Sequence, residues 1–238
     1  MTGSGGKALA ILLIGRVRRL PNSSYSDLPH VEHSALVPAI GLRRSSMRYG
    51  IMANAMNDSE RSLSSPVPEM KAQDVVEILR VFERHGIEVH VDGGWAVDAL
   101  LGQQTRPHAD LDIAIQHNDA PLVRALLAAQ GFREIPRDDS WECNFVLADE
   151  RGRQIDIHSY TFDAAGNHVY GVPYPRESLS GQGLIDGHPV QCIAPEWLVR
   201  FHTGYQLDEN DYHDVKLLCQ HFGLAMPAEY VVFEIEEE

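Results

Sequence analysis

Two aspartates lie one residue apart in residues 110–115 (DLDIAI). In a β-strand, residues i and i+2 point to the same face, so Asp110 and Asp112 would share one face while Leu111 and Ile113 take the other. The two carboxylates would then stand roughly 6–7 Å apart along the strand. Carboxylates at this spacing can converge on one hard cation such as Mg²⁺, which takes oxygen ligands and usually keeps waters and substrate phosphates.

A third acid, Asp156, lies in the similar pattern QIDIH of residues 154–158. Ile155 and Ile157 would point to the core, so Asp156 would point the other way. If this strand lies beside residues 110–115, three carboxylates face one site. Two metal ions held roughly 3.5–4 Å apart by such acids can bridge the phosphates of a nucleotide, which suits nucleotidyl transfer. Asp156 is then expected to bind the second metal or to take the proton from an incoming hydroxyl.

A pair of glycines, Gly93 and Gly94, stands between a short apolar run and a helical pattern. Glycines let the backbone approach a ligand closely, and a helix N-terminus presents unpaired N–H groups with partial positive charge. Together these features favour phosphate. We therefore expect a phosphate-binding turn upstream of the acids.

Alternating helical and strand patterns place these residues in a mixed α/β domain. The helical patterns cover residues 69–85, 95–101, 119–130, 195–201 and 208–222. The strand patterns cover residues 87–91, 110–115, 132–135, 141–148, 153–160 and 188–193, with a hairpin turn at 149–152. Residues 162–187 are expected to form a long polar loop, and such loops are often functional.

Composition limits the partners and the compartment. A formal net charge of −14 over 238 residues argues against general binding to nucleic acid or to anionic membranes, which need basic surface. The three cysteines are not spaced as a disulfide framework or a zinc site, which favours a reducing, cytoplasmic location. No apolar run approaches the ~20 residues of a membrane span.

The chain is expected to divide into three parts. Residues 1–68 lack a sustained period and are interpreted as a disordered or non-native N-terminal extension, with a tail of separate function as the alternative. Residues 69–225 form the catalytic domain with its C-terminal helices. Residues 226–238 are expected to be an acidic tail.

Four segments, in this order, resemble one enzyme group. They are residues 92–99 (DGGWAVDA), residues 106–112 (RPHADLD), the single Asp156, and residues 201–215 (FHTGYQLDENDYHDV). The pattern resembles the nucleotidyltransferase superfamily of DNA polymerase β, most of all the lincosamide nucleotidyltransferases and then the aminoglycoside 2''-nucleotidyltransferases. The resemblance covers about residues 70–222 and implies the polymerase β-like nucleotidyltransferase fold, a small mixed sheet flanked by helices.

The resemblance also assigns roles. It makes Asp110, Asp112 and Asp156 the catalytic acids and metal ligands. It makes Gly93 and Gly94 the phosphate turn, with Gly94 where the wider superfamily commonly has serine. Arg106 and Lys216 are candidate nucleotide-binding residues; the alternatives are that Arg106 pairs with an acid and that Lys216 is an exposed helix lysine. His108 is interpreted as structural. Candidate walls of an acceptor pocket are Trp141, Tyr160, Tyr170, Tyr174 and Tyr205, and Glu142 is a candidate contact for a cationic acceptor.

The expected activity is Mg²⁺-dependent transfer of a nucleoside monophosphate, AMP from ATP, to a hydroxyl of a small molecule such as a lincosamide or aminoglycoside. Two Mg²⁺ ions and a nucleoside triphosphate are expected, with no nucleic acid or membrane partner, in a monomer or homodimer. Three alternatives stay open: a metal-dependent phosphoesterase using His108 and His158 with the acids, a nucleotidylating member of a toxin–antitoxin pair, and a non-catalytic nucleotide-binding module.

Overall fold

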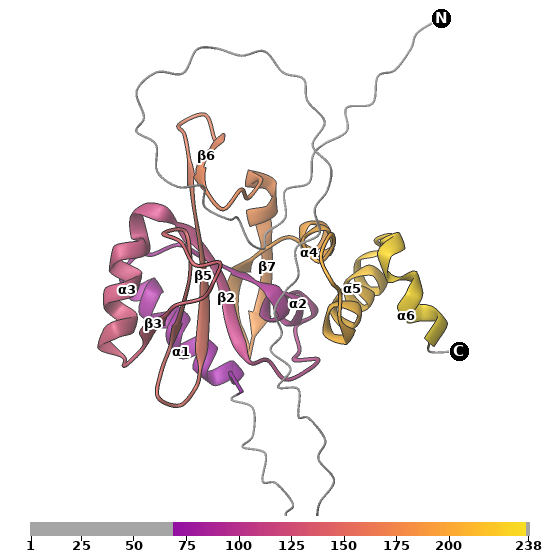
Figure 1. Cartoon of the computed structure of the whole chain (residues 1–238), viewed down its shortest axis with the longest axis horizontal. Helices are drawn as coiled ribbons and strands as arrows, with labels where there is room; N and C mark the ends of the chain where they lie inside the picture. The colour runs from indigo at the N-terminus through magenta and orange to yellow at the C-terminus, as the bar shows by residue number, and fades with distance from the viewer. Residues whose placement is uncertain (1–68, 237–238) are drawn as a thin grey trace, which may run out of the picture.

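The structure is a computed structural model that describes residues 69–236. Its centre is one mixed sheet of eight strands in the order β3-β4-β5-β2-β1-β8-β7, with β6 paired to β5 (Figure 1). The strands are β1 Val89–Asp92, β2 Asp110–Gln116, β3 Arg133–Ile135, β4 Asn144–Ala148, β5 Gln154–Phe162, β6 His168–Gly171, β7 Gly181–Ile185 and β8 His188–Cys192. The pairs β2–β5 and β1–β8 are parallel and the other pairs are antiparallel.

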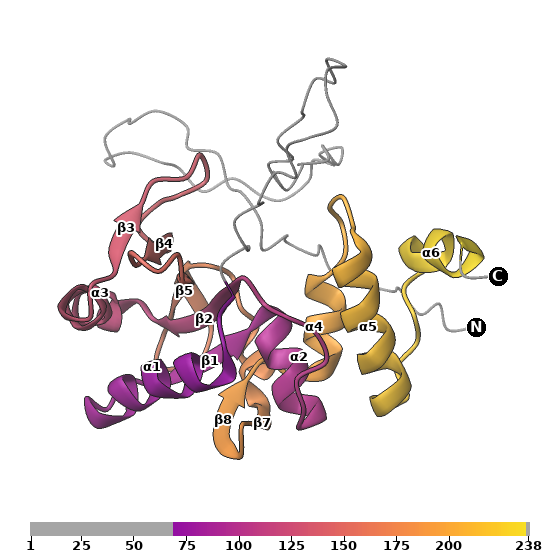
Figure 2. The same cartoon turned by 90° about the horizontal axis from the view of Figure 1, so that it is seen from below.

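The helices gather in two groups, which both views show. α1 and α3 lie to one side of the molecule, and α2, α4 and α5 pack together on the other (Figures 1 and 2). The helices are α1 Ala72–Arg84, α2 Gly93–Leu101, α3 Ala120–Ala129, α4 Pro195–Phe201, α5 Glu209–Phe222 and α6 Val231–Glu236. Short 3-10 turns are η1 His117–Asp119, η2 Arg176–Ser180 and η3 Ala228–Tyr230. The mixed α/β prediction is confirmed.

The core forms where apolar residues alternate along strands or recur at helical spacing. Leu111, Ile113 and Ile115 on β2 are fully buried, as are Ile155 and Ile157 on β5. Burial of apolar surface contributes about 25 cal/mol per Å², so the buried residues of these central strands stabilise the folded domain. Their other faces are left for polar side chains, which sets up the site.

Two segments are more ordered than the sequence suggested. The expected loop of residues 162–187 instead holds β6, η2 and β7, so the sheet is larger than expected and that prediction was wrong. The segment expected as an acidic tail from residue 226 holds η3 and α6. Tyr230 is fully buried there, and its hydroxyl donates to the His202 carbonyl at 2.6 Å, so the folded body extends past residue 225.

Two further expectations concern residues 1–68 and membrane-spanning segments. The extension expected for residues 1–68 lies outside the described residues. Within residues 69–236, no helix combines the length and the apolar character needed to cross a bilayer.

Candidate active site

The register of the sheet sets three aspartates side by side on neighbouring strands. Asp112 on β2 is directly opposite Asp92 on β1 and Asp156 on β5. Asp110 lies two residues before Asp112, opposite Gln154. Residues opposite each other share a face and neighbouring strands lie about 4.8 Å apart, so the structure brings Asp110, Asp112 and Asp156 together on one face. Asp92 was not singled out from the sequence, because only the strand register reveals its neighbours.

Asp156 is held in a setting that disfavours its charge. Its side chain is 26% exposed, and its Oδ1 atom has no hydrogen-bond partner among residues 69–236. Burial raises the pKa of the Asp156 carboxyl, the nearby His158 opposes this, and Asp110 adds to it. His158 Nε2 lies 3.5 Å from Asp156 Oδ1. A carboxylate with this environment suits either a bound cation or the acceptance of a proton.

Asp92 is occupied by internal hydrogen bonds. It is buried, and it accepts bonds from the Gly93 N–H at 2.8 Å and the Tyr174 hydroxyl at 2.7 Å. The Tyr174 hydroxyl oxygen also lies 3.2 Å from His158 Nδ1. Burial, followed by the charge of Asp92, raises the pKa of the Tyr174 hydroxyl, which therefore stays a donor. Asp92 thus caps α2 rather than facing a ligand.

The glycine turn touches the acids directly. Gly93 has φ +59°, a conformation that favours glycine, and a Cβ atom there would lie 2.2 Å from Asp112 Oδ2. A Cβ atom on Gly94 would lie 2.5 Å from Arg106 Nη2 and 2.6 Å from the His108 ring. The structure therefore places the first turn of α2, where N–H groups have no partner within the helix, against Asp112.

Arg106 is paired with an acid, one of the two roles considered for it. Its Nε donates to Asp214 Oδ1 at 2.9 Å and its Nη2 donates to Asp214 Oδ2 at 2.6 Å. Lys216 lies two residues after Asp214 on α5, with its Nζ 5.0 Å from the centroid of the Tyr212 ring. A nucleotide contact by either residue stays a prediction.

The side chain of His108 is held by contacts within the fold, in line with the structural role expected for it. It is buried, bonds Asp98 through Nε2, and packs against Trp95 with ring centroids 4.6 Å apart. Asp98 also accepts bonds from the N–H and the hydroxyl of Thr105, so this cluster fixes the loop that leads into β2. The phosphoesterase alternative needed His108 at the acids, and the structure engages it with Asp98 instead.

The described fold agrees with comparisons to known proteins. A family model for aminoglycoside-2''-adenylyltransferases matches residues 74–218. The chain belongs to the aminoglycoside-2''-adenylyltransferase family. A lincosamide resistance protein of Staphylococcus haemolyticus is 30% identical over 161 residues, which cover 63% of this chain and 98% of that protein. A 2''-aminoglycoside nucleotidyltransferase of Escherichia coli is 24% identical over 123 residues, covering 52% of this chain and 67% of that protein.

Two solved structures share the fold. A lincomycin-bound lincosamide antibiotic adenylyltransferase, LnuA, aligns with TM-score 0.57 and 25% identity, over 66% of this chain and 99% of that one. ANT(2'')-Ia in complex with adenylyl-2''-tobramycin aligns with TM-score 0.55 and 20% identity, over 64% of this chain and 89% of that one. The expected nucleotidyltransferase fold is confirmed, and this adenylyltransferase-family member is a nucleotidyltransferase.

The acids of this adenylyltransferase-family site suit Mg²⁺. In the described part of the chain, no three acidic, histidine or cysteine side chains form a ready-made cage for a metal. Mg²⁺ does not need one, because it is usually held by one or two carboxylates with waters and substrate phosphates. Asp110, Asp112 and Asp156 offer only hard oxygen donors on one face, so they fit an ion whose coordination the nucleotide completes.

Among the candidates for an acceptor wall, the structure separates exposed residues from buried ones. Tyr160 and Tyr174 are fully buried, and the Tyr205 hydroxyl donates to Asp211. Tyr170 is 40% exposed, donates its hydroxyl to Glu142 and meets Trp141 edge-on at 6.4 Å. Glu142 and Tyr170 are therefore the exposed members of this set, and Trp141 and Tyr205 are half-buried.

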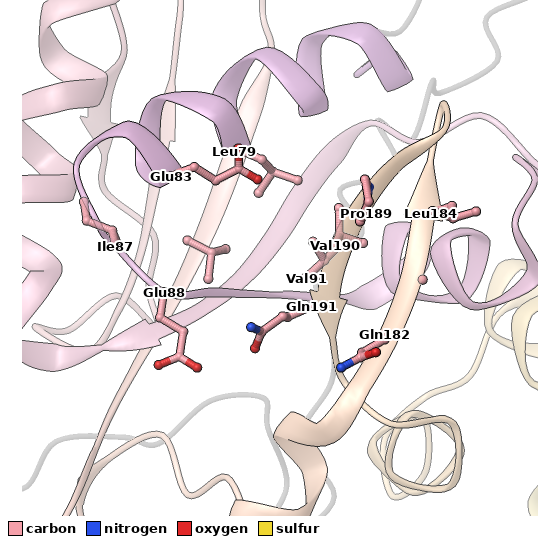
Figure 3. A pocket seen from close by; sticks show the side chains of 12 residues that line it. Leu79, Glu83, Ile87, Glu88, Val91, Gln182, Leu184, Pro189, Val190 and Gln191 are labelled. Atoms are coloured by element: carbon pink, nitrogen blue, oxygen red, sulfur yellow. The ribbon is translucent and has the colours of Figure 1, made fainter.

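A hollow of about 670 Å³ lies elsewhere, between α1 and the β7–β8 hairpin (Figure 3). Leu79 and Glu83 of α1 line it together with Leu184 and Pro189 of the hairpin. Val91 of β1 also lines it, and side chains alternate along a strand, so the hollow faces away from the neighbouring Asp92. We therefore locate the active site by the carboxylates and not by this hollow.

Proposed function

We propose that this enzyme uses Mg²⁺ and ATP to transfer AMP to a hydroxyl of a small-molecule antibiotic. The observation that carries the proposal is the contact between the Gly93 turn and Asp112, with Asp110 and Asp156 on the same face. One edge of the site is built for phosphate and the other for a cation, as a metal–nucleotide complex requires.

Each part of the chain has a role in this proposal. The N–H groups at the start of α2 and the Arg106 guanidinium bind the triphosphate, and Lys216 adds positive charge from α5. Asp110, Asp112 and Asp156 would hold Mg²⁺, which would neutralise charge on the phosphates. The acceptor oxygen bonds to the α-phosphorus, the bond to the β-phosphate breaks, and pyrophosphate leaves.

Asp156 is proposed to take the acceptor's proton. Its Oδ1 atom has no hydrogen-bond partner among residues 69–236, which leaves that oxygen for the proton. The hydroxyl proton therefore moves to a carboxylate oxygen of Asp156 as the new bond to phosphorus forms.

The names of the relatives point to two acceptor classes. The relative at 30% identity is a lincosamide resistance protein, whereas the family model and other relatives name 2''-aminoglycosides. A net charge of −14 suits a cationic aminoglycoside, and the higher identity favours a lincosamide. We propose a lincosamide first. An ATP co-substrate and three unpaired cysteines favour the cytoplasm as its location.

The test is a panel assay with the purified chain. Protein, ATP and Mg²⁺ are incubated with lincosamides and aminoglycosides, and each drug is weighed by mass spectrometry for an added AMP. One class is expected to gain the adduct with stoichiometric pyrophosphate release. Phosphate ester hydrolysis without an adduct would support a phosphoesterase instead, and labelling of protein by radioactive ATP would support a toxin–antitoxin role.

A further inference from the structure

The ion pair between Arg106 and Asp214 joins two distant parts of the chain. The residues are 108 positions apart, one in the loop before β2 and the other on α5. Both guanidinium bonds run to the two oxygens of one carboxylate, at 2.9 and 2.6 Å. The Asp214 side chain is 1% exposed and that of Arg106 is 21% exposed. This is the parallel two-bond geometry that fixes the plane of a guanidinium most firmly.

The guanidinium lies at the phosphate turn. A Cβ atom on Gly94 would come within 2.5 Å of Arg106 Nη2, so the group rests against the glycine at the first turn of α2. Arginine has five N–H donors. Two bond Asp214 and a third bonds the Pro107 carbonyl at 3.2 Å. The other two have no partner among residues 69–236, and they lie in the same region as the unpaired N–H groups of α2.

Nearby acids compete for this arginine. Asp98 and Asp110 also act electrostatically on Arg106. Arginine side chains are long and lose rotamer entropy when they are fixed. Without Asp214, the guanidinium would be free to turn toward those carboxylates and away from the turn.

We propose that Asp214 is a positioning residue for the nucleotide: it fixes the Arg106 guanidinium beside Gly94, where the free N–H groups meet the β- and γ-phosphates. This rests on the proposed function, because it takes the glycine turn as the triphosphate site. It gives α5 a role in nucleotide binding although Asp214 itself touches no ligand.

The test compares two nucleotides that differ in the phosphates Arg106 would contact. Binding of AMP and of α,β-methylene-ATP is measured by calorimetry with Mg²⁺ and the full chain, without acceptor. Charged hydrogen bonds contribute about 1.5–3 kcal/mol, so Asp214→Asn should weaken the triphosphate analogue at least about tenfold. AMP affinity should stay unchanged. Arg106→Lys should show the same selective loss, because lysine cannot reproduce the paired geometry.

Two further variants separate positioning from folding. Asp211→Asn is the matched control: Asp211 is buried on the same helix and bonds Tyr205, not Arg106, so both affinities should match the wild type. Asp214→Glu keeps the buried charge but shifts the guanidinium, so it carries the test if Asp214→Asn does not fold. It should again lose affinity for the triphosphate analogue only.

Each outcome of these binding measurements supports or contradicts a different claim. Unchanged analogue affinity in folded Asp214 variants, or an equal loss of AMP and analogue affinity, would overturn the proposal and leave the pair a structural tie. A wild type that binds no analogue would overturn both this inference and the proposed function. A wild type that binds the analogue, shows the selective loss and modifies no antibiotic would count against the proposed acceptor alone.

Discussion

Asp112 and Asp156 are direct cross-strand partners on the parallel strands β2 and β5. Like charges placed opposite each other in a sheet destabilise it. Burial adds to the cost, because it raises the pKa of Asp156 and so disfavours its charged form. This arrangement destabilises the protein when no cation is bound, and it suits a protein that binds cations. Stability is lower here for the sake of function.

Replacing Asp156 with asparagine should therefore stabilise the metal-free protein while removing activity. Thermal melts in a chelator at pH 7 should show a higher Tm, by about 2–4 °C for each 1 kcal/mol gained in a domain of this size. Transfer should be lost in the same variant. Asp138→Asn, an exposed acid in the preceding loop, should change neither quantity. A lower Tm for Asp156→Asn would contradict the repulsion described above.

Gly93→Ala should damage the site more than the fold. The left-handed conformation costs a non-glycine residue about 1–2 kcal/mol, and the new methyl group would meet Asp112 Oδ2. Displacing a reacting group by about 1 Å can cost about 100-fold in rate. Gly86→Ala is a matched control, since Gly86 has φ +69° with nothing within 4 Å of a Cβ atom. The Gly86→Ala variant should lose similar stability in urea unfolding and keep its activity. Equal transfer rates for the two variants would refute the contact between Gly93 and Asp112.

His108→Ala should act through stability. Removing one partner of a buried hydrogen bond typically costs about 1–3 kcal/mol, because Asp98 would stay buried with only its Thr105 bonds. Urea unfolding should show a loss of this size, and the Mg²⁺ dependence of the residual activity should not change. A variant of normal stability with weakened Mg²⁺ affinity would instead make His108 a metal ligand.

The stability of the protein should also fall in alkali through Cys192. Burial, followed by the charge of Asp92, raises the pKa of its thiol to about 12. A raised pKa in the folded state contributes stability that is present below the thiol's ordinary value of 9.0 and is lost as pH rises toward 12. Melts between pH 8 and 11 should therefore drop less steeply for Cys192→Ala than for the wild type. Parallel curves would contradict this.

The central strands were predictable because their burial pattern is periodic. Alternation at Leu111, Ile113, Ile155 and Ile157 fixed which face carries Asp110, Asp112 and Asp156, and the structure keeps that assignment. The sequence did not predict a role for Asp92, because that role depends on which strand lies beside β2. That information is in the register and not in the local sequence.

The loop and tail predictions failed for related reasons. Residues 162–187 contain β6 and β7, which bury few apolar side chains of their own and so carry no strong alternation. Residues 228–236 read as acidic, yet Tyr230 anchors them through packing against Tyr212 with ring centroids 6.2 Å apart. The Arg106–Asp214 pair spans 108 residues, so sequence could suggest an acid partner for Arg106 but not identify it.

The most direct test of the proposed chemistry is the rate of AMP transfer by Asp112→Asn, measured as mass-detected adduct on the antibiotic that the wild type modifies. The substitution keeps the shape of the side chain and removes its charge. Because electrostatic stabilisation at such sites is worth about 10²–10³-fold or more in rate, transfer should fall to background while circular dichroism and Tm show a folded protein. A folded Asp112→Asn protein that transfers AMP at the wild-type rate would contradict the metal-bound carboxylate site.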